Sequence, residues 1–493
     1  MTNQLKMPRD YAVRGSFDRT GGVVALDDDK LEDRVEGTWW SPTIDRKELK
    51  AFMARSDAAG MAHFGLWFLL LAISAPLAWI AWGTWWAIPA FLLYGTIYSS
   101  SDARWHECGH GTPFRTRWLN EAMYHISSFM TLREGYLWRW SHARHHTSTI
   151  MVGLDPEIQV QRPADLLKIL MDFFNLRSGL PAMRLILRHA CANPTEQVKN
   201  FVPESERWKM YWSSRVYVAI WLAFIIWGIA IGSFLPVMFV ALPRFYGGWL
   251  HQLLGLTQHA GLLEDTWDHR LCTRTVYINP VFRWLYMNMN YHIEHHSLPM
   301  VPYHALPRLH EQIKDQLPPT YPNLWAVYKE LIPALITQAF RDANYVIPRP
   351  LPTPFNKNND PAPVTTPVVP EAVAPTNQLV AATPSVTPTA QWIDVCASAD
   401  IDAEAVIRFE HNGKPYAIYR LRDDDFYATA ALCTHEEFDL TDGLVMNGCI
   451  ECPMHNGRFN IATGKALGPP VYEDLKTYPV EKRGERVFVG LPA

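Results

Sequence analysis

Two long apolar runs divide the first part of the chain. Between Ala58 and Ser101, a run of 44 residues, there is no Asp, Glu, Lys or Arg. Because a helix needs about 20 apolar residues to cross a bilayer, this run predicts two membrane helices joined by a turn near 82–84. A second charge-free run, the 28 residues from Val216 to Pro243, is broken by GSFLP at 232–236. Since apolar sequence continues past Arg244, it predicts either one tilted helix or a second hairpin whose later helix carries Arg244.

Basic residues flank the first apolar run and are absent from its predicted turn. Segments rich in Lys and Arg remain on the cytosolic side of a membrane. We therefore expect a multi-pass protein of the inner membrane, with the N-terminal arm and the region 102–213 in the cytosol. The flanking residues are Arg46, Lys47, Lys50 and Arg55 before the run, and Arg104, Arg115, Arg117, Arg133 and Arg139 after it.

The hydropathy pattern changes after Val346. Eleven prolines between 348 and 388 predict an extended linker that cannot form a core. Beyond the linker, segments such as YAIYRL and RVFVGL show the alternation typical of β-strands. The expected organisation is a cytosolic arm at 1–55, an α-helical membrane unit with a cytosolic cap at 56–346, a linker at 347–390 and a small all-β domain at 391–493.

Composition limits the functional classes. A net charge of −4 gives no reason to expect nucleic acid as a partner, and 20 tryptophans suit a membrane interface. Seven cysteines without dense spacing argue against a disulfide scaffold and favour a reducing compartment. These features agree with a membrane protein whose polar parts face the cytosol.

Three sets of histidines have helical spacing. Residues three and four apart share one face of a helix, so each set offers two or three imidazoles to one point. Three sets beside apolar segments are too many to be structural filler. The sets are His106 and His110 in HECGH, His142, His145 and His146 in SHARHH, and His292, His295 and His296 in YHIEHH.

Eight imidazoles exceed the needs of one metal ion. Zinc takes four ligands, or three and a water when it is catalytic, so eight predict two transition metals. Imidazole suits iron, copper, nickel and zinc alike. For the three sets to meet, the chain must cross the membrane an even number of times between His146 and His292, which favours the second hairpin and four membrane helices. HECGH alone also matches a zinc peptidase with Glu107 as general base, but that reading leaves SHARHH and YHIEHH without a role.

HECGH, SHARHH and NYHIEHHSLPMVPY resemble the three histidine boxes of the membrane fatty-acid desaturase and hydroxylase superfamily, to which alkane and xylene monooxygenases are related. The resemblance covers about residues 60–315 and implies four membrane helices, a cytosolic cap and a di-iron centre of two non-haem irons held mostly by histidine. Family members usually contribute a further histidine before the third box. In this sequence LTQHAGLL places His259 there, making nine, with His251 as the rival.

Carboxylates beside the boxes are candidates to hydrogen-bond the outer imidazole nitrogens, and each is equally a candidate for a solvated or capping acid. These carboxylates are Glu107, Asp155 and Glu294. Cys108 is expected to be a packing residue. The other histidines are expected to be structural or exposed: His63, His125, His189, His251, His269, His304, His310 and His411.

Two short motifs in the last domain combine cysteine with histidine. CTH supplies Cys433 and His435, and CPMH supplies Cys452 and His455. Two thiolates and two imidazoles suit a [2Fe–2S] cluster with cysteines on one iron and histidines on the other, with structural zinc as the alternative. Together with the following Gly457 and Phe459, the motifs resemble the Rieske ferredoxin pattern. Cys449 lacks a partner cysteine in the first loop, so no disulfide between the loops is expected.

Taken together, the two halves predict an O₂-dependent oxidoreductase that oxidises an unactivated C–H bond of a lipid or another hydrophobic substrate held in an apolar channel. The box style narrowly favours desaturation over hydroxylation. The chain has no GxGxxG sequence that opens a helix, so a separate NAD(P)H-dependent flavin reductase is the expected partner. A membrane zinc peptidase and a non-enzymatic, membrane-anchored Rieske electron carrier are the alternatives. Substrate, regiochemistry, oligomeric state and whether the cluster reduces its own or a neighbouring chain are left open.

Overall fold

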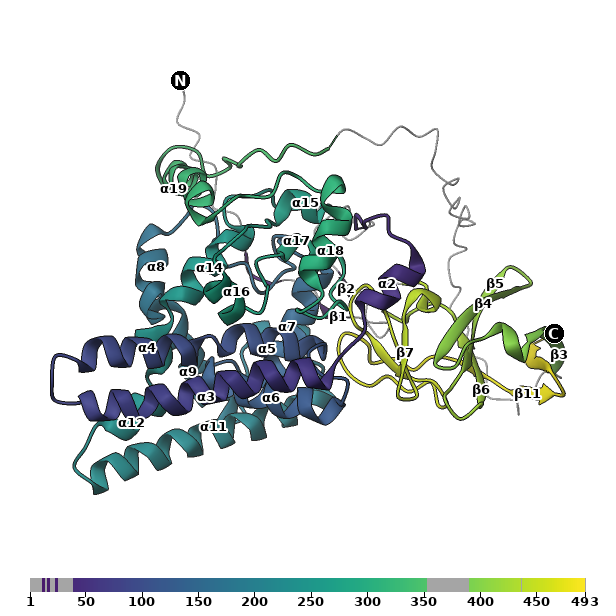
Figure 1. The fold of residues 1–493 in the computed structure, drawn as a ribbon, viewed down its shortest axis with the longest axis horizontal. Coiled ribbons are helices and arrows are strands. Elements are labelled where there is room, and N and C mark those ends of the chain that lie inside the picture. Colours follow the sequence, from purple (N-terminus) through teal and green to yellow (C-terminus); the bar gives the residue numbers. More distant parts are fainter. Residues whose placement is uncertain are drawn as a thin grey trace, which may run out of the picture.

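The computed structural model describes residues 11–13, 16–17, 23–24, 39–352, 390–435 and 437–492. A helical body and a small β domain lie side by side, as predicted (Figure 1). Most of the predicted arm at 1–55 and nearly all of the predicted linker at 347–390 lie outside the described residues.

The first apolar run forms the predicted hairpin. Helix α3 (Asp57–Ala81) begins after Ser56, whose hydroxyl accepts from the Ala59 backbone N–H. The chain turns through Gly83, which has the positive φ that glycine adopts without strain, and returns as α4 (Ala87–Ser99). Helix α5 (Ser101–His110) follows at once and carries the first histidine set out of the hairpin.

The second apolar run also doubles back, but its return is broken. Helix α11 (Glu204–Ala230) ends just before GSFLP, as predicted, and the chain returns as α12 (Leu235–Val240), α13 (Pro243–Gly247) and α14 (Trp249–His259). Helices α4 and α13 meet backbone to backbone, because a Cβ added at Gly247 would lie 1.9 Å from the Gly95 carbonyl carbon. The return arm therefore reaches the histidines as three short segments instead of one long helix.

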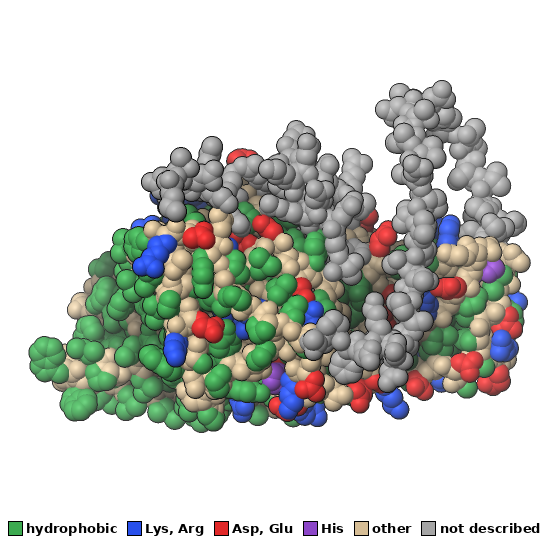
Figure 2. Space-filling model, turned by 90° about the horizontal axis from the view of Figure 1, so that it is seen from above, with side chains coloured by type: hydrophobic (Ala, Val, Ile, Leu, Met, Phe, Trp, Pro, Cys, Tyr) green, Lys and Arg blue, Asp and Glu red, His purple; other side chains and the backbone are tan. Residues whose placement is uncertain are grey.

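Two described helices, α3 with 25 residues and α11 with 27, are long and apolar enough to cross a membrane. The other two predicted crossings correspond to α4, which has 13 residues, and to the broken arm, so a count of four membrane helices stays a prediction. Large apolar side chains cover the far end of the hairpins, including Trp85 at 88% exposure and Ile229 at 76%. This end forms the green surface on the left of Figure 2. Apolar surface of this extent marks a contact with membrane or protein.

Shorter helices form a cap around the histidines. They are α2 (Arg46–Phe52), α6 (Arg117–Met130), α7 (Gly135–Thr147), α8 (Leu166–Met171), η1 (Asp172–Phe174), α9 (Leu176–Ala190), α10 (Glu196–Phe201), α15 (His269–Cys272), α16 (Pro280–Leu285), α17 (His292–Ser297), α18 (Leu306–Ile313), η2 (Lys314–Gln316) and α19 (Leu324–Phe340). Two strands of two residues each, β1 (Ser16–Phe17) and β2 (Val23–Val24), pair antiparallel.

The C-terminal domain consists of three small antiparallel sheets with strand orders β10-β6-β5-β4, β11-β12-β3 and β7-β8-β9. YAIYRL lies mostly in β5 and RVFVGL in β12, so the predicted strands are confirmed. The strands are β3 (Ala390–Ala397), β4 (Ala405–His411), β5 (Lys414–Arg420), β6 (Phe426–Ala430), β7 (Leu444–Met446), β8 (Cys449–Glu451), β9 (Arg458–Asn460), β10 (Thr477–Tyr478), β11 (Val480–Arg483) and β12 (Arg486–Pro492), with short 3₁₀ turns η3 (Ser398–Asp400) and η4 (Leu440–Asp442).

Candidate metal centres

The three histidine sets come together from helices α5, α7 and α17. Helix α5 stops directly after His110, where Gly111 takes a left-handed conformation with φ 68°. Glu134 is the N-cap of helix α7, and its carboxylate accepts from the backbone N–H groups of Tyr136 and Leu137. All eight box histidines are buried, and His259 at the end of α14 is partly buried.

The inner nitrogens of these histidines divide into two groups. In the first group, the potential ligand atoms of five residues lie within 4.8 Å of one another: His106, His110, His142, His146 and His295. The second group contains His145, His259 and His296 under the same limit. His292 joins the second group, because its Nε2 lies 3.0 Å from His259 Nε2 and 3.2 Å from His296 Nε2.

His251, the rival for the ninth position, lies outside both groups. Its Nδ1 is 3.4 Å from Asp102 Oδ1. A shift of eight residues along one helix rotates a side chain by about 80°, so the two histidines of α14 face different ways. The structure thus brings His259, and not His251, to the cluster.

In the second group, the ring nitrogen that faces away from the group is hydrogen-bonded to the protein. The lone pair of the other ring nitrogen then points into the group. His259 Nδ1 lies 2.9 Å from the carbonyl oxygen of Cys272, which can only accept, so His259 carries its proton on Nδ1. The Nε2 lone pair of His259 therefore points at His292 Nε2, 3.0 Å away. Two nitrogens that bind one ion at about 2.0–2.1 Å lie about 3 Å apart when their bonds are roughly perpendicular. The residues present fit a metal ion in this position.

The first group follows the same pattern. His142 Nδ1 lies 3.1 Å from a carboxylate oxygen of Glu157, which leaves its Nε2 facing His110 Nε2 at 3.1 Å. His295 Nε2 lies 3.3 Å from His146 Nε2. Burial lowers the pKa of His106, His110, His146 and His295 well below the ordinary value. Neutral imidazoles are the form that binds metal, so these four histidines of the first group are ready for an ion at neutral pH.

The three carboxylates singled out in the sequence behave differently from one another. Asp155 lies 2.8 Å from His145 Nδ1, and although burial opposes it, this carboxylate raises the pKa of His145. Glu107 Oε1 is 3.9 Å from His295 Nδ1, too far for a hydrogen bond. Glu294 contacts His310, which had been expected to be structural or exposed, and contacts no box histidine.

Sequence reasoning missed two side chains that hold the imidazoles. Glu157 partners His142, and Thr149 Oγ1 lies 3.1 Å from His296 Nδ1. Glu157 belongs to the same GLDPEI turn as Asp155. The presence of two acids two residues apart in one loop is the sequence signal that could have identified Glu157. Thr149 lies three residues after the second box and belongs to no motif of its own.

Replacing Asp155 by asparagine is expected to weaken metal binding by about 10–100-fold, the usual cost of losing the outer partner of a ligand histidine. The amide keeps the size of the side chain but cannot accept in the same charge-assisted way. Iron content after dialysis against graded chelator measures the effect. Asp265→Asn is the matched control, because Asp265 accepts from the Val152 backbone in the same region and belongs to neither histidine group. Equal iron retention in both variants would contradict the assignment.

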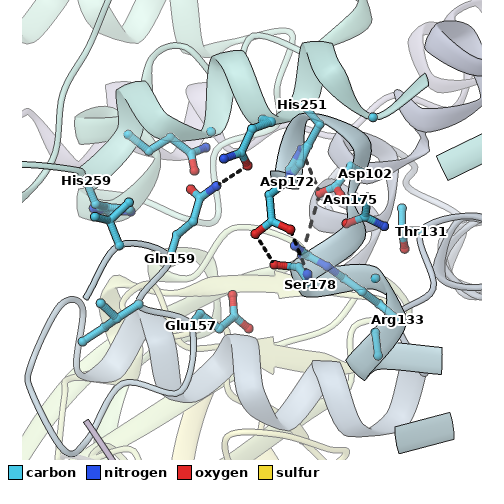
Figure 3. A pocket seen from close by; sticks show the side chains of 18 of the residues that line it. Asp102, Thr131, Arg133, Glu157, Gln159, Asp172, Asn175, Ser178, His251 and His259 are labelled. Carbon is cyan, nitrogen blue, oxygen red and sulfur yellow. Dashed lines mark hydrogen bonds and ion pairs between the residues drawn. The ribbon is translucent and has the colours of Figure 1, made fainter. Parts of the chain in front are cut away.

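A cavity of about 560 Å³ opens on both histidine groups (Figure 3). One end is lined by box histidines together with Trp105, Trp138 and Met289. The other end is polar: Asp172 accepts from the Ser178 backbone N–H and hydroxyl, and Gln159 donates to Gln252. The cavity that reaches the histidines therefore has a mixed polar and apolar lining, and the apolar channel expected from the sequence stays a prediction.

A buried ion-pair network closes one side of this cavity. Asp102 contacts Arg244, lies 3.7 Å from Arg133 and is 3.4 Å from His251. Burial raises the pKa of Asp102, but the three basic neighbours outweigh burial and hold it below the usual range. The carboxylate remains charged and stays paired with the arginines.

In the β domain, the four residues of the CTH and CPMH motifs lie in two matching loops. All four are buried, and the rings of His435 and His455 lie 5.0 Å apart at 87°. The Cys433 N–H donates to the Phe438 carbonyl and the Cys452 N–H to the Gly457 carbonyl, so each cysteine begins a tight turn. Burial lowers the pKa of His435 to about 4. Neutral imidazoles and adjacent thiols fit a cluster ligated by two cysteines and two histidines.

The loop packing also accounts for Gly457. A Cβ at this position would lie 2.7 Å from Val471 Cγ1 and 3.6 Å from Cys433 Sγ. Cys449 forms no disulfide, as expected, and its sulfur lies 3.8 Å from the Asn447 carbonyl oxygen.

Comparison with known proteins identifies both halves. The fatty acid desaturase family model matches residues 83–328, and the Rieske [2Fe-2S] domain model matches residues 391–479. The ferredoxin component of the naphthalene 1,2-dioxygenase system of Pseudomonas aeruginosa is 42% identical over 103 residues, which are 21% of this chain and 98% of the relative. The ferredoxin component of the naphthalene 1,2-dioxygenase/salicylate 5-hydroxylase systems of a Ralstonia species is 43% identical over 101 residues, 20% and 96% of the two chains. Among solved structures, the Sphingomonas yanoikuyae B1 ferredoxin is 33% identical and covers 21% of this chain and 100% of its own, with a TM-score of 0.20.

Proposed function

Because this chain unites a domain of the fatty acid desaturase family with a C-terminal Rieske [2Fe-2S] domain, it is an oxidoreductase, and we propose that it is an O₂-dependent di-iron enzyme that oxidises an unactivated C–H bond. The observation that carries the proposal is the division of nine inner histidine nitrogens into two adjacent groups at the end of one cavity. A pair of irons bound there would supply the O₂ chemistry of C–H oxidation.

The side chains of the protein would hold the two irons and keep the ligand histidines oriented. His106, His110, His142, His146 and His295 would hold one iron, and His145, His259, His292 and His296 the other. Asp155 and Glu157 fix the orientation of His145 and His142. The buried walls around the cluster exclude bulk water from the reacting bond.

The mixed lining of the cavity favours an amphiphilic substrate. An apolar segment would lie against Trp105, Trp138 and Met289, beside the histidines, while a polar group would reach the Asp172 and Ser178 end. A pure hydrocarbon would displace water from this polar lining and offer it no hydrogen bond in return, which is costly. We therefore propose a lipid or small amphiphile with a hydrogen-bonding group, and desaturation and hydroxylation remain the two candidate outcomes.

A membrane location follows from the same proposal. Helices α3 and α11 would cross an inner membrane, and the exposed apolar end of the hairpins would lie in the lipid. The histidine cluster and the β domain would then lie in the cytosol, within reach of a separate NAD(P)H-dependent flavin reductase.

The peptidase alternative is disfavoured by the position of Glu107. A general base must be free to take a proton from water at the metal. Here Glu107 Oε2 accepts from Thr112 Oγ1 at 2.9 Å and from the Tyr303 backbone N–H at 3.3 Å. The carboxylate is thereby held in the protein interior, and His106 and His110 are shared with three further histidines.

Metal analysis and product analysis test the proposal together. The protein purified in detergent is expected to contain about four irons, two in a cluster and two among the box histidines. With reductase and NAD(P)H, oxygen uptake should accompany a substrate mass that falls by two hydrogens or rises by one oxygen. One or two zinc ions and no oxygen uptake would favour the peptidase. A reducible cluster without oxygen uptake, tested against a membrane lipid extract, would favour the electron carrier.

A further inference from the structure

The two candidate metal centres lie against each other across the domain boundary. Asn456, next to the cluster residue His455, donates through its side-chain amide to the backbone carbonyl of His110. Thr147 Oγ1, next to His146, lies 3.5 Å from Nε2 of the cluster residue His435. Each loop of the β domain therefore reaches a residue that belongs to, or adjoins, the first histidine group.

The space between the centres is nearly closed. A cavity of about 30 Å³, room for no more than about two waters, is lined by residues from both domains. His106, His110, His142 and His146 contribute from the helical body, and His455, Asn456 and Pro469 contribute from the β domain. No further protein layer separates the two sets of ligands here.

A buried ion pair secures this arrangement beside the cluster loop. Arg55, just before α3, contacts both carboxylate oxygens of Glu451, which directly precedes Cys452. The two side chains are only 3% and 5% exposed. A buried charge that loses its partner is strongly destabilising. Loss of either Arg55 or Glu451 would therefore destabilise the docked arrangement of the two domains.

Apolar contacts surround the ion pair. Met454 packs on the core that contains Trp39, Ile150 and Met151, and Leu444 packs on the core of α17 and α18. Tyr472 packs near Trp140 on α7. Docking thus involves α5, α7, α17 and α18 together, and Figure 1 shows the β domain lying beside the helical body.

From these contacts we infer that the Rieske domain docks on the histidine cluster of its own chain and reduces it there, with Thr147 and Asn456 as the bridging residues. The inference rests on the proposed function for its redox part and answers whether the cluster serves its own or a neighbouring chain. Each transfer oxidises the reduced centre held by Cys433, His435, Cys452 and His455 by one electron and reduces the histidine-held centre by one. Two transfers are needed per turnover, and the electrons come from NAD(P)H through the reductase.

Cross-linking tests the docking without relying on activity. Arg115 and Glu404 form a rim pair across the same boundary at 3.4 Å, with side chains 46% and 25% exposed. In full-length protein with Cys191→Ser and Cys449→Ser, the changes Arg115→Cys and Glu404→Cys, treated with a short bis-maleimide, should give a band of monomer mass. A protease site inserted between 353 and 389 should then leave the two fragments joined. A band of dimer mass, or fragments that separate after cleavage, would overturn the inference.

The ion pair provides a kinetic test with a matched control. Glu451→Gln is expected to slow the re-oxidation of the chemically reduced cluster by O₂ at least about tenfold, because it leaves Arg55 buried and unpaired. Glu404→Gln, at the exposed rim, should change the rate by less than about twofold. The cluster absorbance reports the rate directly. Equal rates in the two variants would contradict the role of the Arg55–Glu451 pair.

Complementation separates transfer within a chain from transfer between chains. Co-expressed His145→Ala and Cys433→Ser chains, one lacking a working histidine site and the other a cluster, should give no product. Recovered product would show transfer between chains and would overturn the inference while leaving the proposed function intact. Monomer-mass cross-links in a protein that never consumes oxygen would refute the proposed function and leave the docking in place.

Discussion

Alanine at His145 or His296 is expected to lower product formation by more than about a hundredfold, since even the loss of a ligand's outer partner costs about 10–100-fold. Both residues belong to the group formed by His145, His259, His292 and His296, and either change removes one of its four imidazoles. Mass spectrometry of the product measures the loss, and the iron content should fall from about four to between about two and three per chain.

The spectrum of the Rieske cluster should be unchanged in both variants, because its ligands lie in a domain with its own two cores. His125→Ala on α6 is the control, since this histidine lies outside both groups and contacts Tyr124 and Tyr136. Turnover that persists in His145→Ala, or a cluster signal that disappears with it, would show that the site is wrongly assigned.

Replacing Cys452 by serine is expected to abolish the cluster signal and, with it, turnover supported by the reductase. Cys452 is 1% exposed at the start of its loop, and a hydroxyl does not replace a thiolate on iron at neutral pH. The iron content should fall to about two per chain, the pair held by histidine. Electron paramagnetic resonance of the reduced protein and product analysis report the two losses separately.

Cys449→Ser is the control for this experiment. It is three residues away on β8, partly exposed, and contacts the Asn447 carbonyl instead of a cluster residue. Wild-type turnover by Cys452→Ser, driven by the same reductase, would rule out the cluster as the entry point for electrons.

The histidine sets could be found in the sequence because their signal is local. Spacings of three and four residues place imidazoles on one helical face wherever the helix lies. Their partners could not be found in this way. Whether Glu157 or Glu294 faces a box histidine depends on how a loop turns, and Glu294 is instead engaged by His310 and by Thr275.

Long-range features were hidden for the same reason. The polar end of the cavity combines Gln159, Asp172 and Gln252 from three separate segments, and each one alone reads as an ordinary surface residue. The return arm after α11 was predicted as one helix, but breaks before Pro243 and at Gly248 divide it into three. The contact between Asn456 and His110 joins residues 346 positions apart, which no local pattern indicates.

The prediction of strand β5 was correct, but the sequence did not show that both faces of this strand are buried. Tyr416, Ala417, Ile418 and Tyr419 are all buried, so β5 is buried on both faces. Tyr416 and Ile418 pack into one core, and Ala417 and Tyr419 into the other. Successive side chains of β5 therefore point alternately into two different hydrophobic cores, one on each face of the strand.

The hydrogen bonds of the outer nitrogens make the two histidine groups mechanically unequal. His145, His259 and His296 are each anchored, by Asp155, the Cys272 carbonyl and Thr149. In the other group, Nδ1 of His106, His146 and His295 has no hydrogen-bond partner among the described residues. The second group is therefore held more firmly than the first, whose imidazoles have fewer hydrogen bonds to fix their orientation. The first group is also the one that lies against the β domain.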